Sequence, residues 1–514
     1  MTARPEAVTD TGRVRGLWRD HASADGRVSR SAAFLGIPYA AAPVREARFA
    51  APLPAAHWDG VREAVLHGAT PQRVSPFVNP AIPEPSVPGS ETLTVSVTTP
   101  DPSPGAHLPV LVWIHGGGFI GGSPASPWYA GQAMARDGVV TVSVSYRLGF
   151  EGFGWVDGGV NNRGVRDWLA ALEWVQRNVS SFGGDPARVT IGGQSAGGAA
   201  VMRLLAMPAA QHLFGAVLAI SPPDVPATVE QAREASVLMA SHFGVSPSEL
   251  GFSGVDERAL FDARDLASAP PTAADPVAAI ADALTGALPL SPIIDGDLIP
   301  QSIAGALAAG VGADKRVLIG ATAHEFNGAT AQFAPMLAGS DVADILERAG
   351  IPARVARAMA ERADAEPDVG EVPGSASGAR VARALGQAVT DLVFRRNVAG
   401  WAEIRERAGA EPTWAYDFRW ESRAPGIEGS VHCIDLPFCF DVLARPDAHR
   451  LTGDAPQKLA DAVHADWLGL ISGALVDAPR FGGERSTIVY RDAPIREVEP
   501  GYKLEGELWD ATSD

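Results

Sequence analysis

Ser195 lies in a pattern typical of a serine that acts as a nucleophile. Residues 193–197 read Gly-Gln-Ser-Ala-Gly, which fits the motif G-x-S-x-G. In a chain this rich in glycine the motif alone is weak evidence. Here it follows an apolar run, Val189–Gly193, and precedes a predicted short helix, so the serine would cap a sharp strand-to-helix turn. The helix dipole would favour negative charge at that point. The alternative is a solvent-facing serine in a Gly-rich turn.

A second Gly-rich segment has the composition of an oxyanion hole. His115 and three consecutive glycines follow the apolar run Val110–Ile114. Glycines leave their backbone N–H groups uncovered, so these donors can approach a developing oxyanion closely. We expect the N–H groups of Gly117, Gly118 and Ala196 to serve as donors. The alternatives are a flexible loop or a phosphate cradle, but no G-K-[ST] follows. We expect His115 to order this loop rather than to act as a base.

The elements that would position these groups alternate between apolar runs and helical patterns. A helix is predicted over 166–179, where apolar residues recur at helical spacing, and the breakers Phe182–Pro186 end it. This alternation predicts an α/β fold with a mostly parallel central sheet and helices on both faces. Further strands are predicted at 110–115, 139–146, 189–193, 217–220, 317–319 and 414–418. We expect one catalytic domain over 1–514, with Ala-rich helical insertions above the sheet at about 225–288 and 329–411.

Together with three further segments, these motifs resemble the type B carboxylesterase and cholinesterase-like family of α/β-hydrolases. The segments are Phe34–Ala40 (FLGIPYA), Tyr146–Gly149 (YRLG) and Phe182–Pro186 (FGGDP), and they occur in the order that the family shows. The resemblance covers most of the chain. It implies the α/β-hydrolase fold and hydrolysis of esters.

The resemblance also implies the two partners of Ser195. Glu325, in a loop after the predicted strand at 317–319, corresponds to the acid of the family, although Phe326 replaces the glycine that usually follows it. His432 corresponds to the base, with Cys433 in place of a glycine. The chain order Ser, Glu, His agrees with the order usual in this fold.

Other departures from the family pattern carry information. Gln194 stands where the family usually has a glutamate, which removes a negative charge and disfavours choline-type cationic substrates. Thr70 and Thr92 replace the cysteines of a family disulfide, which is consistent with a reducing compartment. Arg147 and Asp167 are candidates for a structural ion pair.

Bulk properties exclude several classes of protein. The chain has 514 residues and a net charge of −18, so its surface repels nucleic-acid phosphates and no nucleic-acid partner is expected. It shows no secretory signal and no apolar stretch that would span a membrane. We therefore expect a cytoplasmic protein without a membrane partner. The oligomeric state is not predictable from the sequence.

The function predicted from these residues is hydrolysis of small-molecule carboxylic esters through an acyl-enzyme on Ser195. This chemistry needs no metal and no cofactor. Two alternatives remain: a carbamate or aryl-amide hydrolase with the same triad, and a non-catalytic binding protein of the family, which typically lacks the serine or the histidine. Aromatic residues are candidates for the pocket wall, although most aromatics lie in the core; they are Phe119, Trp128, Phe153, Trp155 and Phe438.

Overall fold

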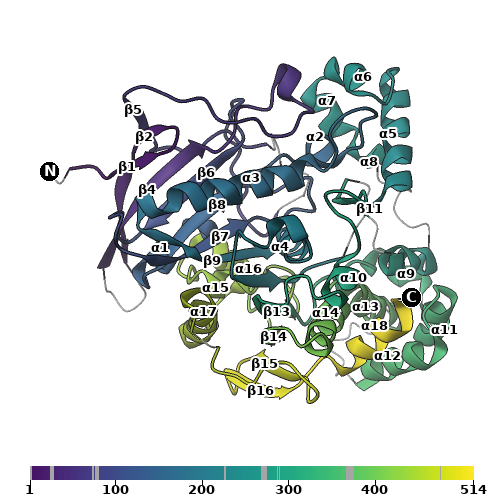
Figure 1. Ribbon diagram of the computed structural model, residues 1–514. Coiled ribbons are helices and arrows are strands. Elements are labelled where there is room, and N and C mark those ends of the chain that lie inside the picture. The colour runs from purple at the N-terminus through teal and green to yellow at the C-terminus, as the bar shows by residue number, and fades with distance from the viewer. Residues whose placement is uncertain are drawn as a thin grey trace.

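The centre of the molecule is an 11-stranded sheet in the order β16-β15-β14-β13-β10-β9-β7-β8-β6-β4-β3 (Figure 1). The computed structural model describes residues 3–22, 28–71, 75, 80–224, 227–267, 275–285, 288, 290–365, 376–474 and 476–513. The strands are β3 (Leu17–Ala22), β4 (Val28–Pro38), β6 (Thr94–Thr99), β7 (Leu108–Ile114), β8 (Val140–Val144), β9 (Gly184–Gln194), β10 (Ala216–Ile220), β13 (Arg316–Thr322), β14 (Thr413–Phe418), β15 (Ser486–Tyr490) and β16 (Arg496–Pro500). The central run from β8 to β15 is parallel, and the strands at both edges are antiparallel.

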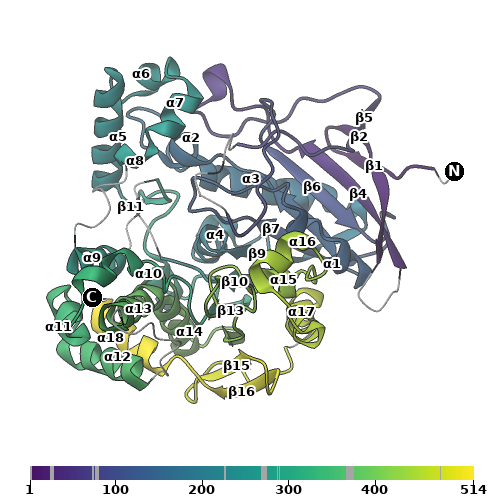
Figure 2. The same ribbon diagram turned by 180° about the vertical axis from the view of Figure 1, so that it is seen from behind.

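The parallel strands are buried on both faces, which explains their continuous apolar sequences. Along β7, Val110 and Val112 belong to one hydrophobic cluster, and Leu111 and Trp113 belong to another. The first cluster includes side chains of α3 (Arg163–Asn178), α4 (Ala196–Leu205) and α14 (Arg396–Arg407). The second includes side chains of α17 (Gln457–Ser472). Figures 1 and 2 show these helices around the central sheet from opposite sides.

The predicted strands and the predicted helix are confirmed, and several of their boundaries differ by a few residues. The apolar runs form β7, β8, β9, β10, β13 and β14, and the helix is α3. However, β9 already begins at Gly184, so part of the predicted breaker segment is strand. The reason is tertiary, because Gly184 pairs with Leu108 ahead of an irregularity in the β7–β9 register. The antiparallel edge strands were not predicted, since polar or charged residues interrupt the apolar pattern in each of them.

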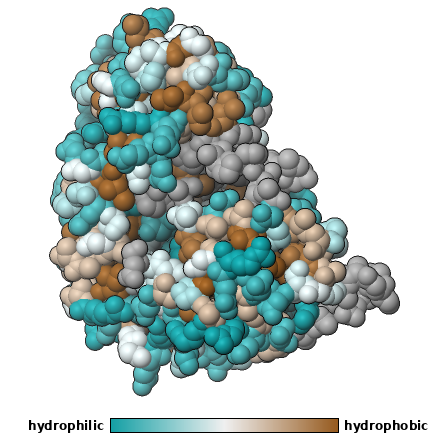
Figure 3. All heavy atoms as spheres, turned by 90° about the vertical axis from the view of Figure 1, so that its right-hand side faces the viewer, coloured by the Kyte–Doolittle hydropathy of each residue, from teal (hydrophilic) through white to brown (hydrophobic). Residues whose placement is uncertain are grey.

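Two groups of helices lie on one side of the sheet, at the right of Figure 1. The upper group is α5 (Val229–Phe243), α6 (Glu249–Ser253), α7 (Glu257–Asp262) and α8 (Arg264–Ala267). The lower group is α9 (Pro276–Thr285), α11 (Val342–Arg348), α12 (Ala353–Ala365), α13 (Ala376–Thr390) and α18 (Lys503–Thr512), which share a third hydrophobic cluster. Figure 3 views this side and shows apolar surface on the upper group, where Leu250 is 85% exposed.

Most of these helices come from the segments 225–288 and 329–411. Residues 225–226, 268–274, 286–287 and 366–375 of those segments lie outside the described residues, as does 289 just beyond the first. α14, at the end of the second segment, packs against β13 and β14 and belongs to the layer that covers the sheet. None of the helices that the structure describes has the length and apolar character needed to cross a lipid bilayer.

A buried ion pair connects α3 to the segment after β8. Arg147 Nε and Nη2 donate to the two carboxylate oxygens of Asp167 at 2.9 and 2.7 Å, and the Arg147 backbone N–H donates to Oδ2 at 3.0 Å. Arg147 Nη1 donates to the Ala50 carbonyl at 2.7 Å. Both charged side chains are almost fully buried. The pairing predicted from the sequence is thereby confirmed.

Removing one partner of this pair is expected to destabilise the fold. Asp167→Ala leaves the Arg147 guanidinium buried without its anion, which costs about 3–5 kcal/mol. Urea denaturation followed by tryptophan fluorescence measures the loss. The control is Asp262→Ala, which breaks the exposed pair with Arg258 and should cost no more than about 0.5 kcal/mol. Equal unfolding midpoints for the two variants would contradict the expectation.

Candidate active site

Ser195 occupies a strained turn between β9 and α4. Its backbone has φ 57° and ψ −125°, a conformation that non-glycine residues rarely adopt. The N–H of Ser195 donates to the Ile220 carbonyl, at the end of β10, at 2.9 Å. Such strain persists only where the surrounding structure enforces it, and it is frequent at functional sites. The sequence prediction of a sharp strand-to-helix turn at Ser195 agrees with this geometry.

The glycines around Ser195 are required by the close approach of backbone atoms. A Cβ on Gly193 would lie 2.3 Å from the carbonyl oxygen of Gly197. A Cβ on Gly197 would lie 2.0 Å from the carbonyl oxygen of Ile114, at the end of β7. Any side chain at either position would therefore push the turn away from the neighbouring strand.

The Gly-rich loop after β7 lies directly beside Ser195. A Cβ on Gly116 would be 3.2 Å from the Cβ of Ser195. Gly117 and Gly118 have φ values of 115° and 60°, which glycine adopts without strain. The loop folds back on itself, because the N–H of Gly121 donates to the Gly117 carbonyl at 2.8 Å.

His115 orders this loop. Its Nδ1 donates to the Gly116 carbonyl at 2.8 Å, and its ring stacks on Tyr146 with the ring centroids 4.6 Å apart. The Tyr146 hydroxyl donates to the His115 carbonyl at 2.8 Å. Burial lowers the pKa of His115 to about 4, so the imidazole is neutral at physiological pH.

His432 and Glu325 are in hydrogen-bond contact, although they are far apart in the sequence. Nδ1 of His432 donates to Oε2 of Glu325, and the backbone N–H of His432 donates to the Glu325 carbonyl at 3.2 Å. The other carboxylate oxygen of Glu325 accepts from the N–H of Thr322, the last residue of β13, at 2.7 Å. Glu325 is buried, and these bonds fix both its position and the tautomer of His432. Cys433, in place of the glycine usual in the family, has φ 72°.

Gln194 provides a contact that sequence reasoning missed. Its Nε2 lies 3.1 Å from Nε2 of His432, so the amide donates to this ring nitrogen when the imidazole is neutral. The imidazole also packs against Phe326 and Phe394, with ring centroids 5.0 and 4.9 Å away, and the two phenyl rings contact each other. Phe394 belongs to a short π-helical turn, Asp391–Arg395, and no motif in the sequence marked it.

The pKa of His432 lies well above its ordinary value. Burial alone would lower it, but the adjacent Cys433 and the Glu325 carboxylate stabilise the cation and outweigh burial. An imidazole of this kind accepts a proton readily and holds it beside a fixed carboxylate.

All the predicted site residues except Glu325 line one cavity of about 660 Å³. Its wall includes Gly116–Gly118, Ser195, Ala196 and His432, and Glu325 lies behind His432. Most of the remaining wall is apolar; it includes Ile82, Phe119, Tyr129, Leu288, Phe326, Val389, Val393 and Phe394. Of the aromatic candidates from the sequence, Phe119 lines the cavity, whereas Trp128, Phe153 and Phe438 are core residues. Among the described residues no group of three or more His, Cys, Asp or Glu side chains could hold a metal ion.

Comparison with known proteins identifies the family. Residues 3–467 match the sequence model of the Carboxylesterase family. The chain belongs to this family. The para-nitrobenzyl esterase of Bacillus subtilis (strain 168) is 32% identical to this carboxylesterase over 491 residues, which are 92% of this chain and 94% of the relative.

Two further comparisons agree over nearly the full length. The phenmedipham hydrolase of Pseudarthrobacter oxydans is 31% identical over 484 residues, 92% of this chain and 90% of that protein. A solved carboxylesterase structure from Geobacillus stearothermophilus matches with a TM-score of 0.78 at 27% identity, covering 98% of this chain and all of the other. This carboxylesterase is therefore a serine hydrolase with the α/β-hydrolase fold.

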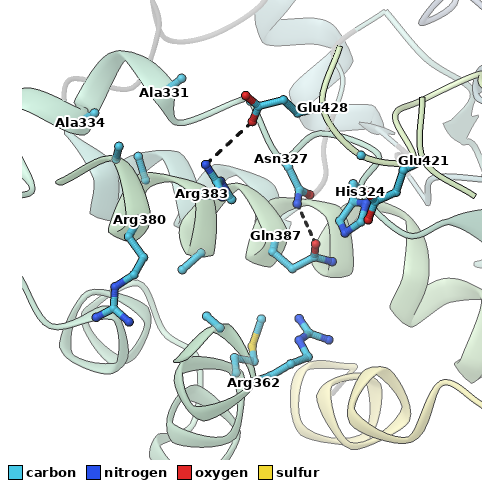
Figure 4. A pocket seen from close by; sticks show the side chains of 17 residues that line it. His324, Asn327, Ala331, Ala334, Arg362, Arg380, Arg383, Gln387, Glu421 and Glu428 are labelled. Carbon is cyan, nitrogen blue, oxygen red and sulfur yellow. Dashed lines mark hydrogen bonds and ion pairs between the residues drawn. The ribbon is translucent and has the colours of Figure 1, made fainter. Parts of the chain in front are cut away.

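A second cavity, of about 580 Å³, lies beside the segment that carries Glu325 (Figure 4). His324 and Asn327, which flank Glu325 and Phe326, are part of its wall. Figure 4 shows Asn327 donating to Gln387, at 2.8 Å, and Arg383 paired with Glu428, at 3.8 Å. The loop that carries Glu325 thus contributes residues to the walls of both cavities.

The packing around Ser195 predicts a strong effect of one added methyl group. Gly197→Ala places a Cβ against the Ile114 carbonyl, and overpacking of this kind costs about 1–3 kcal/mol or more. The thermal unfolding midpoint of this carboxylesterase should fall accordingly. The control is Gly105→Ala, because a Cβ at Gly105 meets nothing within 4 Å. An unchanged midpoint for Gly197→Ala would show that the turn is looser than the structure indicates.

Proposed function

We propose that this carboxylesterase hydrolyses carboxylic esters of small molecules through an acyl-enzyme on Ser195, with His432 as the base and Glu325 as the acid of a triad. The main support is that Ser195, His432 and the bare glycine amides line one cavity, while Glu325 fixes the imidazole from behind. The strain at Ser195 and the family relationship support the same assignment.

In the proposed reaction His432 Nε2 takes the proton of the Ser195 hydroxyl as the oxygen attacks the ester carbonyl carbon. The N–H groups of Gly117, Gly118 and Ala196 hold the oxyanion, and Glu325 stabilises the imidazolium. Collapse of the tetrahedral intermediate expels the alcohol, which receives the proton from His432. A water molecule, deprotonated by His432, then attacks the acyl-enzyme, and the carboxylic acid and free Ser195 are released.

This route requires His432 Nε2 to exchange its contact with Gln194 for one with the neighbouring Ser195. Catalytic hydrogen bonds of this kind often align only when substrate is bound. Because Gln194 is neutral, its side chain can move away from the imidazole without separating an ion pair. The exchange therefore has a low free-energy cost. The same geometry serves carbamate and aryl-amide bonds, and matched ester, carbamate and anilide substrates would rank the three.

The nucleophile is tested by Ser195→Ala. Because a triad acts as a unit, hydrolysis of p-nitrophenyl acetate should fall by about 10⁵–10⁶-fold. Circular dichroism and the unfolding midpoint serve as controls for folding. A fluorophosphonate probe should label the wild-type protein and leave the variant unlabelled, which also separates an esterase from a binding protein. A variant that keeps a tenth of the wild-type turnover would refute the proposal.

The base is tested by the pH dependence of kcat/KM. Activity requires the deprotonated imidazole, so it rises with pH, and the raised pKa of His432 puts this rise above about pH 6.5. Glu325→Gln removes a charge that stabilises the cation, so the rise in its residual activity should move to lower pH, by about one pH unit or more. The control is Glu428→Gln, an exposed carboxylate near His432 in sequence, which should leave the midpoint in place. Midpoints that coincide in all three proteins would exclude His432 as the base.

A further inference from the structure

Apart from His432, the charged wall residues of the catalytic cavity are acidic. Glu84 and Asp282 contribute carboxylates, and no lysine or arginine belongs to the wall among the residues that the structure describes. Asp282 is exposed at α9, whereas Glu84 is only partly accessible. The electrostatic character of the cavity therefore depends mainly on Glu84, in an otherwise apolar surrounding where charge effects are strong.

Glu84 is only partly satisfied by the protein. Its carboxylate accepts hydrogen bonds from the backbone of Gly122, in the Gly-rich loop, and from the hydroxyl of Ser75. Its Oε2 atom is buried and has no hydrogen-bond partner within the described chain. Burial raises the pKa of Glu84, as expected for a carboxylate whose negative charge is not fully stabilised by its surroundings. A buried acceptor in this condition is costly unless a ligand supplies a donor.

His115 contributes a second acceptor to the same wall. Because its Nδ1 donates to the Gly116 carbonyl, its Nε2 carries a lone pair. This atom is also buried without a partner in the part of the chain that the structure describes, and the residue is 1% exposed. Among the described wall residues, the two buried side-chain atoms without a partner are thus both acceptors. Gly122 lies beside both residues: its backbone bonds Glu84, and a Cβ there would lie 2.5 Å from His115 Nδ1.

The second cavity provides a contrast that makes Glu84 unusual. There the arginines are matched by carboxylates: Arg362 binds Asp391, Arg380 binds Asp364 at 2.7 Å, and Arg383 is paired with Glu428 (Figure 4). That wall is internally balanced and needs no ligand charge. In the catalytic cavity, by contrast, no arginine or lysine among the described wall residues is matched to Glu84.

We propose that the catalytic cavity selects esters that carry an ammonium or another N–H donor group away from the scissile bond, and that Glu84 is the residue that selects them. This inference rests on the proposed esterase function. Gln194 carries no charge beside the serine, so the negative charge of the cavity wall lies on Glu84 and on the exposed Asp282. A hydrogen-bonding ammonium suits two acceptors, whereas a quaternary ammonium has no N–H to give them.

The test compares three p-nitrophenyl esters with acyl chains of similar length: 6-aminohexanoate, heptanoate and hydrogen adipate, which end in an ammonium, a methyl and a carboxylate group. Rates are measured at pH 8 against enzyme-free blanks, for wild type and for Glu84→Gln, which keeps an acceptor for Gly122. Glu84→Gln should lower kcat/KM for the ammonium ester about tenfold and raise it for the carboxylate ester. The heptanoate ester should change by no more than about twofold.

A second pair of substrates tests for an N–H donor on the alcohol side of the ester. These substrates are the acetates of 3-aminopropanol and n-butanol, and their hydrolysis is measured by titrating the acid released. A selective loss for the ammonium ester in either series supports the proposal. The proposal is overturned if Glu84→Gln affects all esters equally, which would leave Glu84 as an anchor of Gly122 only, or affects none. It is also overturned if Asp282→Asn, which removes the exposed charge, reproduces the contrast alone. The esterase function is tested separately by hydrolysis of the heptanoate ester. If this hydrolysis is lost in Ser195→Ala, the esterase function holds whatever the result for Glu84→Gln.

Discussion

The site depends on how closely the chain is packed around Ser195. The turn that carries this residue lies between the ends of β7 and β10, close enough that its glycines have no room for a Cβ. The hydrogen bond from the Ser195 N–H to the Ile220 carbonyl holds a backbone conformation that would otherwise relax. The parallel sheet supplies this confinement, because the carboxyl ends of neighbouring strands meet at one edge. The orientation of the serine is therefore a property of the sheet and not of the local sequence alone.

Part of the site could be predicted from the sequence because it consists of turns at this edge of the sheet. Ser195 and the Gly-rich loop carry local signals, since a turn and an oxyanion loop impose residue types at fixed positions. Glu325 and His432 have no such signal by themselves and were placed only by resemblance to a family. Their catalytic roles stay predictions, although the structure brings the two side chains into contact. The central strands were predictable because strands buried on both faces must be continuously apolar.

Other features depend on contacts between segments that are distant in the chain. Phe394 reaches His432 through a π-helical turn in a region read only as Ala-rich and helical. Glu84 lies in a Pro-rich segment whose sequence gave no reason to single out one carboxylate. Its importance depends on its surroundings in space, namely a cavity, a glycine amide and described wall residues that include no arginine. The edge strands were not predicted for a related reason: their strand conformation depends on pairing with neighbouring strands in the sheet.

The order of the site along the chain has a consequence for biosynthesis. Ser195 follows β9, Glu325 follows β13, and His432 follows β14, which itself needs β15 as a neighbour on one side. A nascent chain that has left the ribosome only as far as β10 contains Ser195 but neither Glu325 nor His432. Such a chain lacks two of the three side chains that the proposed triad requires, so the proposed reaction has to wait until β14 and the segment after it have been synthesised.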